Sequence, residues 1–249
     1  LNKEQPLEMV PTFLGAHEVP DNYRDNRPAY IQLVIEEMIP EVSRRKLAKY
    51  CDVFCETGVF SVEESRQILL AGKRNGLQIR MHADELSSSG GAELAADLAA
   101  VTADHLIKVS DEGIRAMAEK QVIPVLLPAT TFFLRKNAYA PADKMRAAGC
   151  RMAIATDFNP GSSMTQNMQL VWTISALKLG MLPGELLWAS TLIPALSLNL
   201  GQQVGSIEIG KQGDLLLLDI PNLEYLAYHM GINHVAVTLK KGEVVFRKC

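Results

Sequence analysis

Hydrophobic and polar positions alternate in regular blocks along most of this chain. Short apolar runs of strand length occupy residues 10–16, 53–55, 78–81, 102–105, 122–127 and 151–156. Stretches with helical spacing separate them, at residues 30–47, 61–77, 91–101, 111–120 and 142–148, and two more follow at 165–179 and 183–200. Apolar positions three and four residues apart indicate helices packed through one face. Strands and helices alternating in this way predict parallel βαβ units.

The pattern of apolar and polar residues changes near residue 204. Short strands are predicted at residues 204–209, 214–219, 234–239 and 243–246, and Gly-rich turns rather than helices separate most of them. Several short strands joined by such turns indicate a small sheet rather than further βαβ units. We therefore predict two domains, an α/β domain over residues 1–203 and a C-terminal β portion over residues 204–249.

Six strand–helix units precede that tail, whereas a closed TIM-type (β/α)8 barrel needs eight. An open doubly wound sheet is the alternative, and it predicts a Gly-rich phosphate loop of the form G-x-G-x-x-G after an early strand. The sequence contains no such motif. The pattern therefore favours a barrel from which two units are absent. Because the chain opens with Leu1 almost inside a strand pattern, we expect an N-terminally incomplete sequence.

The composition excludes several classes of protein. With 249 residues, 48% hydrophobic and 21% charged, the chain is an ordinary globular protein with enough residues for one large core. A net charge of -3 gives no support to a nucleic-acid surface, and no apolar run approaches the roughly 20 residues of a membrane helix. The four cysteines, Cys51, Cys55, Cys150 and Cys249, are too few and too irregular for a disulfide framework. We expect free thiols and a cytoplasmic protein.

Candidate chemistry collects where the apolar runs end. His17, His82, His105 and Asp157 each stand at the end of a predicted strand, and Glu85 follows His82 by three positions. In parallel barrels the C-terminal ends of the strands carry the active site. Imidazole ligands combined with a carboxylate that handles the proton of a bound water are typical of zinc-type hydrolytic sites. We therefore interpret this set as a metal-centred hydrolytic site.

Each of these residues also has a plainer interpretation. His82 and Glu85 could be a surface histidine beside an unrelated acid, and His105 a buried histidine bonded to its neighbours. Asp157 could cap a turn, although the loop after it offers Asn159, Gly161, Ser162 and Ser163 as polar contacts for a substrate. Cys55 and Glu56 could ligate a metal or could simply end a strand. No role is assigned to His229 or His234, nor to Arg24, Arg27 and Arg135.

Six segments taken in order resemble one known family. They are G-A-H-E-V-P, V-F-C-E-T-G-V-F-S, H-A-D-E-L, A-D-H-L, L-L-P-A-T-T-F-F-L and A-T-D-F-N-P-G-S-S. Together they resemble the imidazolonepropionases of the amidohydrolase superfamily, from about residue 11 to the C-terminus. The segment G-K-Q-G-D-L-L-L-L-D resembles the C-terminal β-sandwich segment of that superfamily.

The resemblance implies a reaction and a role for each matching residue. The reaction is metal-dependent hydrolysis of the ring amide of 4-imidazolone-5-propanoate to N-formimidoyl-L-glutamate. His82 and Asp157 resemble metal ligands, Glu85 the acid that contacts the bound water and the substrate, and His105 the histidine that polarises the carbonyl. The residues that resemble substrate contacts are His17, Glu85, Asn159, Gly161 and Ser162. One divalent or trivalent ion is implied, with zinc favoured and iron as the alternative.

The family's first barrel strand supplies a His-x-His pair of ligands, and none occurs in these residues. The resemblance therefore implies that strands one and two are absent, and that the chain by itself could be inactive because it lacks these two ligands. Two alternatives stay open: another cyclic amide, amidine or amino hydrolase of the superfamily, or a metal-free barrel fragment that only binds a ligand or partner. Either Glu85 or Asp157 could be the general base. The expected partner is a small-molecule substrate, and apolar residues 164–179 and 182–200 could support a homodimer.

Overall fold

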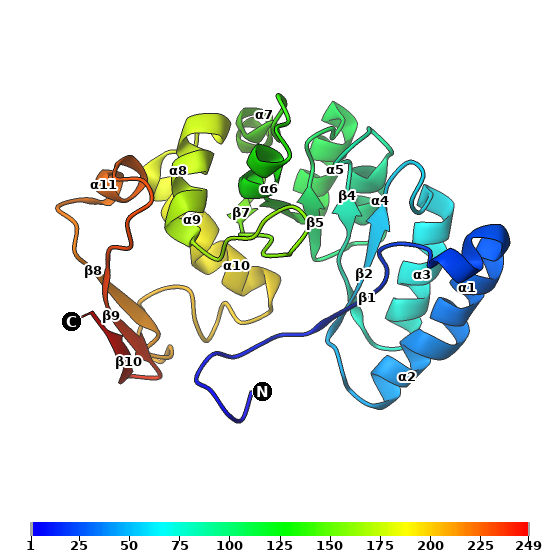
Figure 1. The fold of residues 1–249 in the computed structure, drawn as a ribbon, viewed down its shortest axis with the longest axis horizontal. Helices are drawn as coiled ribbons and strands as arrows, with labels where there is room; N and C mark the ends of the chain where they lie inside the picture. Colours follow the sequence, from blue (N-terminus) through cyan, green and yellow to red (C-terminus); the bar gives the residue numbers. More distant parts are fainter. Residues whose placement is uncertain (1, 249) are drawn as a thin grey trace. The chain divides into compact units, whose positions relative to one another are not determined.

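The computed structural model describes residues 2–248, which form two compact units (Figure 1). Unit 2 comprises Val10–Leu126 and Asp143–Arg151, and unit 1 comprises residues 2–9, Leu127–Ala142 and 152–248. We describe each unit by itself. Unit 2 contains most of the predicted strand–helix repeats, and unit 1 contains the end of the repeat pattern and the predicted β tail.

Unit 2 is built on a parallel sheet. Its strands are β1 (Thr12–Ala16), β2 (Tyr50–Cys55), β3 (Gln78–Ile79), β4 (His82–Ala83), β5 (Thr102–His105) and β6 (Ile123–Leu126). β1 pairs with β2, β2 with β3 and β4, β4 with β5, and β5 with β6, and all of these pairs are parallel. The predicted parallel βαβ order is therefore confirmed in this unit. The carboxyl ends of β2, β4 and β5 lie at one edge of the sheet.

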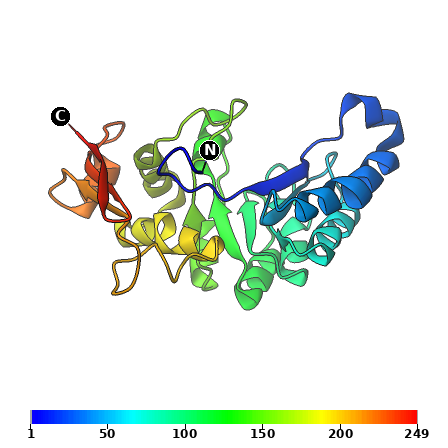
Figure 2. The same ribbon diagram turned by 90° about the horizontal axis from the view of Figure 1, so that it is seen from below.

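Helices cover one side of this sheet (Figure 2). They are η1 (Asp21–Asn26), α1 (Arg27–Leu33), η2 (Val34–Met38), α2 (Ile39–Arg44), α3 (Val62–Arg74), α4 (Gly91–Asp97) and α5 (Asp111–Lys120), with α7 (Ala142–Ala147) at the edge of the unit. A capping box begins α3, with the Ser61 hydroxyl accepting from Glu64 N and the Glu64 carboxylate accepting from Ser61 N. α4 and α5 pack closely because Gly113 has no side chain, and a Cβ there would lie 2.8 Å from Ala92.

Unit 1 contains helices and a separate antiparallel sheet. Its elements are α6 (Pro128–Phe133), β7 (Ala153–Ile154), α8 (Met168–Leu179), α9 (Pro183–Ser190), α10 (Leu192–Ser197), β8 (Leu215–Leu218), α11 (Leu223–Tyr228), β9 (Val235–Lys240) and β10 (Glu243–Arg247). The three-stranded sheet has the order β10-β9-β8. Lys241 and Gly242 both have positive φ, of 56° and 84°. Two such residues form the turn that suits a tight antiparallel hairpin between β9 and β10.

Three expectations for unit 1 are wrong. Residues 204–209 form no strand, because Gly205 turns the backbone at φ 96° and the polar contacts of Ser206, Glu208 and Lys211 stay within this segment. The helix expected over 183–200 is interrupted at Thr191, whose ψ of -85° is not helical. A short helix, α11, lies between β8 and β9 where no helix was expected, with Asn222 as its cap.

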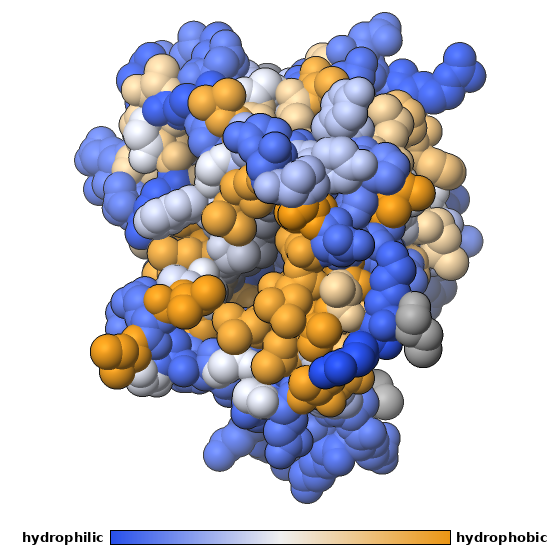
Figure 3. Space-filling view, turned by 90° about the vertical axis from the view of Figure 1, so that its left-hand side faces the viewer, coloured by the Kyte–Doolittle hydropathy of each residue, from blue (hydrophilic) through white to orange (hydrophobic). Residues whose placement is uncertain are grey.

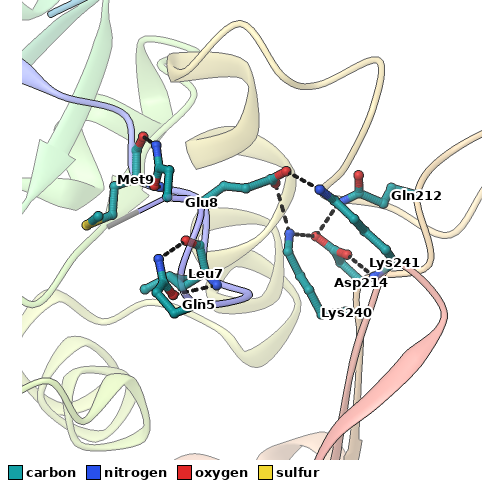
Figure 4. Close-up of polar contacts among 9 residues, drawn as sticks. Gln5, Leu7, Glu8, Met9, Gln212, Asp214, Lys240 and Lys241 are labelled. Atoms are coloured by element: carbon teal, nitrogen blue, oxygen red, sulfur yellow. Dashed lines mark hydrogen bonds and ion pairs between the residues drawn. The ribbon is translucent and has the colours of Figure 1, made fainter. Parts of the chain in front are cut away.

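Apolar side chains remain exposed on the C-terminal sheet of unit 1. Leu216 and Leu217 of β8 are more than half exposed, and Val244 and Phe246 of β10 are close to half exposed. Figure 3, which views the side of Figure 1 where these strands lie, shows apolar residues gathered there. At the end of the sheet, Glu8 contacts Lys240 and Lys241, and Lys240 also contacts Asp214 (Figure 4).

Cys51 and Cys55 are buried free thiols and Cys150 is a half-buried one, as expected, whereas Cys249 lies outside the described residues. Burial raises the pKa of Cys51 to about 12, so this thiol is not a nucleophile at neutral pH. Among residues 2–248, none of the helices combines the length and the apolar character that a bilayer crossing requires.

Candidate active site

Three of the strand-end histidines lie together in unit 2. The ring of His82 is 5.3 Å from that of His105 and 6.0 Å from that of His17, measured between centroids. Phe54 stacks against His17 at 5.5 Å and contacts the edge of His82 at 5.8 Å. Residues far apart in sequence therefore meet at the carboxyl edge of the parallel sheet, as the strand-end pattern predicts.

His82 and His105 meet through the strand register together with an irregular backbone at the end of β5. His82 pairs with Asp104 and Ala83 with His105. Because side chains alternate between the two faces of a strand, His105 in a regular strand would point away from the His82 side. The backbone at His105 and at Leu106 instead adopts φ values of 72° and 60°. This left-handed turn ends β5 and breaks the alternation. Such conformations are costly for residues with a side chain and collect at functional sites.

Glu85 lies beside His105. Its Oε1 is 3.7 Å from His105 Nδ1, and the two side chains are only 11% and 4% exposed. The separation is longer than a hydrogen bond, so the pair is a close electrostatic contact. Burial, together with the neighbouring rings of His82 and His17, lowers the pKa of His105 to about 3. His105 is therefore a neutral imidazole at physiological pH.

The loop that carries Glu85 is held by the buried carboxylate of Asp84. Asp84 Oδ1 accepts from Ser89 N at 2.8 Å and from Gly90 N at 3.1 Å, and Oδ2 accepts from Ala92 N at 2.9 Å. These amides include the start of α4, whose N–H groups have no partner within the helix. Asp84 itself adopts φ 50°. The arrangement fixes the chain on both sides of Glu85.

Glu56 holds the same loop from the neighbouring strand. It follows β2, is 1% exposed, and accepts from Leu86 N at 2.8 Å and from Thr57 N at 2.9 Å. The Ser87 hydroxyl also donates to it. We left open whether Glu56 ligates a metal, and its hydrogen bonds show that its two oxygens bind the loop instead. Its contact with Leu86 N lies next to Glu85 and so helps to place that side chain.

Two further carboxylates beside His82 were missed by the sequence interpretation. His82 Nδ1 lies 3.0 Å from Asp52 Oδ1, and Asp52 is 5% exposed. One ligand atom from each of Asp52, His82 and Asp104 lies within 4.8 Å of the others. Burial raises the pKa of Asp104 above its ordinary value, and the nearby Asp52 carboxylate adds to the rise. The signal in the sequence was an acid directly before one apolar run, Asp52, and an acid within another, Asp104.

This donor set fits a divalent metal ion. Imidazole nitrogen and carboxylate oxygen are common ligands of zinc and iron. Asp104 Oδ1 and His105 Nδ1 are buried atoms without a hydrogen-bond partner among residues 2–248, and buried polar atoms of this kind are uncommon unless a ligand, ion or water satisfies them. Unit 2 therefore holds a possible metal site around His82.

The other predicted site residues form a second group, in unit 1. Asp157 follows β7 with φ 50°, and Thr130 donates to its Oδ2 at 2.6 Å. Asn159 Oδ1 accepts from the amides of Gly161 and Ser162, both at 2.8 Å. The loop is thus a compact turn built around Asn159. The structure brings His17, His82, Glu85 and His105 together in one unit and Asp157, Asn159, Gly161 and Ser162 together in the other. That the two groups form one site stays a prediction.

A cleft of about 340 Å³ in unit 2 borders His17 and Phe54. Arg24 and Arg27 also line it. Arg27 is paired with Glu64 at 2.7 Å and Arg24 with Asp21 at 2.7 Å. Both guanidinium groups already have carboxylate partners, and no role is assigned to them.

Comparison with known proteins identifies the family. The model of the amidohydrolase family matches residues 8–245. Imidazolonepropionase from Alkaliphilus oremlandii is 46% identical over 248 residues, which cover 100% of this chain and 59% of that protein. The enzyme of the same name from a Geobacillus species is 50% identical over 247 residues, covering 99% and 58%. The chain thus spans less than two thirds of the length of these relatives.

Solved structures agree on the fold. An adenosine deaminase from Xanthomonas campestris with bound zinc matches with a TM-score of 0.72 and 19% identity, over 94% of this chain and 60% of that one. The ochratoxinase of A. niger matches with a TM-score of 0.65 and 22% identity, over 84% and 54%. The fold therefore corresponds to part of an amidohydrolase-type (β/α)8 barrel with an additional C-terminal sheet, as predicted. The chain belongs to the amidohydrolase family.

Proposed function

We propose that this chain provides the site for metal-dependent hydrolysis of 4-imidazolone-5-propanoate to N-formimidoyl-L-glutamate, a step of histidine breakdown. The observation that carries the proposal is the identity of 46–50% to imidazolonepropionases over essentially the whole chain. The clustering of His17, His82, His105 and Glu85 at one sheet edge supports it.

His82 and Asp157 would hold the metal ion, with zinc favoured and iron as the alternative. When bound, such an ion lowers the pKa of a coordinated water towards neutrality and so provides hydroxide without a strong base. Asp157 lies in the other unit from His82, and its place beside His82 is part of the proposal. The short hydrogen bond from the Thr130 hydroxyl to Asp157 supports Asp157 as a ligand. Hydrogen bonds from residues outside the ligand set orient ligating carboxylates.

Glu85 would manage the proton of the attacking water and contact the substrate. A carboxylate fixed by its loop on both sides is suited to a proton transfer that needs a defined position. Asp157 is the alternative base. His105, neutral because burial lowers its pKa, would donate a hydrogen bond to the ring carbonyl as negative charge develops there. A well-placed donor of this kind lowers the activation barrier by roughly 3–4 kcal/mol.

His17, Asn159, Gly161 and Ser162 would contact the substrate. His17 is exposed at the mouth of the histidine cluster and stacks on Phe54, which suits a planar ring. The turn around Asn159 presents hydroxyl and amide groups, which suit the polar atoms of an imidazolone. These contacts, like the metal ligands, rest on matching motifs and on local geometry within each unit.

The purified full-length protein, loaded with zinc or with iron, should be incubated with 4-imidazolone-5-propanoate and the product identified by mass spectrometry as N-formimidoyl-glutamate. A neutral purine or pyrimidine of similar size serves as the comparison substrate. Comparable kcat/KM on the neutral ring would favour an aminohydrolase of the same superfamily. Absence of both turnover and metal binding would favour a metal-free ligand-binding fragment.

Several broader assignments are also proposals. We place the boundary between the barrel portion and the C-terminal β portion at residues 203 and 204. Exposed apolar side chains on α8 and before and within α9, namely Leu177, Leu182 and Trp188, support a homodimer, which light scattering of the purified protein would test. A small molecule is the expected partner, and the cytoplasm is the expected location.

A further inference from the structure

The inner face of the unit 2 sheet carries charge where a barrel is usually apolar. Interiors of parallel barrels are filled mainly by Val, Ile and Leu. Here Phe54 pairs with His82, and His82 with Asp104, in neighbouring strands. Asp52 lies two residues before Phe54 and therefore on the same face. Two carboxylates thus flank the one histidine that the family resemblance makes a metal ligand.

The contact between Asp52 and His82 selects one form of the imidazole. Asp52 Oδ1 lies 3.0 Å from His82 Nδ1, which is a hydrogen-bond distance. A carboxylate accepts, so the ring proton lies on Nδ1. In the neutral ring, Nε2 then carries the lone pair that binds a metal. Asp52 is 5% exposed and the His82 side chain 16% exposed, so water competes little for this bond.

Asp104 provides a built-in contrast. It is a neighbour of His82 in the same cluster, but its Oδ1 has no hydrogen-bond partner among the described residues. Both acids place a carboxyl group near the ring, and Asp52 is the one whose carboxylate lies at hydrogen-bond distance from Nδ1. Removing each charge in turn therefore separates a general electrostatic effect from the effect of the bond.

We propose that Asp52 is a positioning residue that holds His82 in the Nδ1-protonated form and presents Nε2 as the metal ligand. The proposal rests on the proposed function in one respect, that His82 is a ligand. An orienting carboxylate makes its imidazole a better electron donor and fixes the angle of the ring. Asp52 would thus raise metal affinity without contacting the metal or the substrate.

The first test needs no variant. Two-bond ¹H–¹⁵N correlation spectra of the metal-free protein, with ¹⁵N-labelled histidine, report which ring nitrogen carries the proton. His82 is assigned from the signal lost in His82→Gln. We expect the Nδ1-protonated form in the wild type. An Nε2-protonated or rapidly exchanging His82 would overturn the proposal.

The second test measures zinc affinity by competition with a chromophoric chelator, using zinc alone and no substrate. Asp52→Asn should weaken zinc binding by about 10–100-fold, the usual cost of losing such an orienting group, and should shift the His82 nitrogen signals. Asp104→Asn removes the neighbouring charge but not the bond to Nδ1, so it should weaken zinc binding less than Asp52→Asn and leave the His82 nitrogen signals close to the wild type. Circular dichroism and thermal unfolding establish that each variant is folded.

Each other result counts against the proposal. Equal losses in Asp52→Asn and Asp104→Asn would mean that charge alone matters. Two zinc ions per chain, reduced to one by either variant, would mean that Asp52, His82 and Asp104 are themselves a cation site. No zinc binding by the wild type would also overturn the proposal. Failure of the proposed function differs from all of these, because turnover of imidazolone propionate would be absent while the protonation state of His82 and its dependence on Asp52 remained as expected.

Discussion

Two pairs of histidines in this protein lie at almost the same separation but in very different surroundings. The rings of His82 and His105 in unit 2 are 5.3 Å apart, and those of His229 and His234 in unit 1 are 5.0 Å apart. Distances near 5 Å are compatible with two imidazoles sharing one metal ion, and equally with simple ring packing. The separation alone therefore does not distinguish a site from a packed pair.

The neighbours make the difference. His82 and His105 are bordered by the carboxylates of Asp52, Asp104 and Glu85, and His105 sits in a strained left-handed backbone. The ring of Tyr225 lies 5.1 Å from that of His229 and 5.5 Å from that of His234. The first pair combines acids, orientation and burial, whereas the second is an aromatic cluster. Chemistry is expected where polar groups are held in place at a conformational cost.

The largest effect should come from Glu85→Gln. If Glu85 manages a proton, the substitution should leave metal content nearly unchanged and lower turnover of imidazolone propionate by about 10²–10⁴-fold. Glu224 is an exposed acid on α11, the helix that ends before His229, and Glu224→Gln should change neither. Near-wild-type turnover in Glu85→Gln would remove the acid–base role and shift it to Asp157.

The next test compares the two histidine pairs directly. His82→Gln should weaken zinc binding by at least about 100-fold, because a lost ligand costs more than a lost orienting group. His234→Gln should leave zinc affinity unchanged, although His234, at 7% exposed, is nearly as buried as His105 at 4%. Chelator competition on both variants provides the measurement. A loss of zinc affinity in His234→Gln would show that the surroundings of the two histidine pairs do not determine which pair binds zinc.

The first pair could be predicted because strand ends are visible in the sequence. An apolar run followed by His82 or His105 places the side chain at the carboxyl edge of a parallel sheet, where neighbouring strands bring such residues together. The second pair offered no such pattern and was given no role. The sequence therefore identifies the histidines that lie at the carboxyl edge of the unit 2 sheet, which are His17, His82 and His105.

The supporting carboxylates could not be predicted in the same way. Asp52 lies 30 residues from its partner His82, and Glu56 lies 30 residues from Leu86. An acid within an apolar strand shows that a partner is needed but not which one, because the partner is fixed by strand register. The left-handed backbone of His105 was equally hidden, since no glycine marks it. The prediction of a strand at residues 204–209 was wrong because polar contacts within that segment determine its conformation.

A third prediction compares how helix starts are stabilised in the two units. Asp84→Ala would leave buried amides at the start of α4, including those of Gly91 and Ala92, without an acceptor. We expect a loss of about 2–4 kcal/mol in the free energy of unfolding. Asn222 caps α11 through Tyr225 N at the surface, and Asn222→Ala should cost about 1 kcal/mol. Urea unfolding of both variants tests this, and equal losses would contradict the greater burial assigned to Asp84.

The smallest effect is expected at the surface cluster of unit 1 shown in Figure 4. Burial acts to raise the pKa of Asp214, but hydrogen bonds from Lys240, the Lys241 amide and Gln212 outweigh it and leave the pKa below its ordinary value. Asp214 and Lys240 are 25% and 18% exposed, so solvent screens the pair only in part. We expect Asp214→Asn to cost about 1 kcal/mol at pH 7.

That cost should depend on pH in a defined direction. A carboxyl group with a lowered pKa in the folded protein takes up its proton at higher pH in the unfolded chain, so its contribution is complete above the unfolded pKa of about 3.9 and declines as pH falls towards the folded value. The difference between wild type and Asp214→Asn should therefore be constant from pH 7 to 5 and shrink below about pH 4. Glu243 is an exposed residue on β10, and Glu243→Gln is the control. Its free energy of unfolding should differ little from that of the wild type at every pH measured. Urea unfolding at several pH values provides the measurement, and a difference that grows on acidification would show that Asp214 is not stabilised as a carboxylate by Lys240.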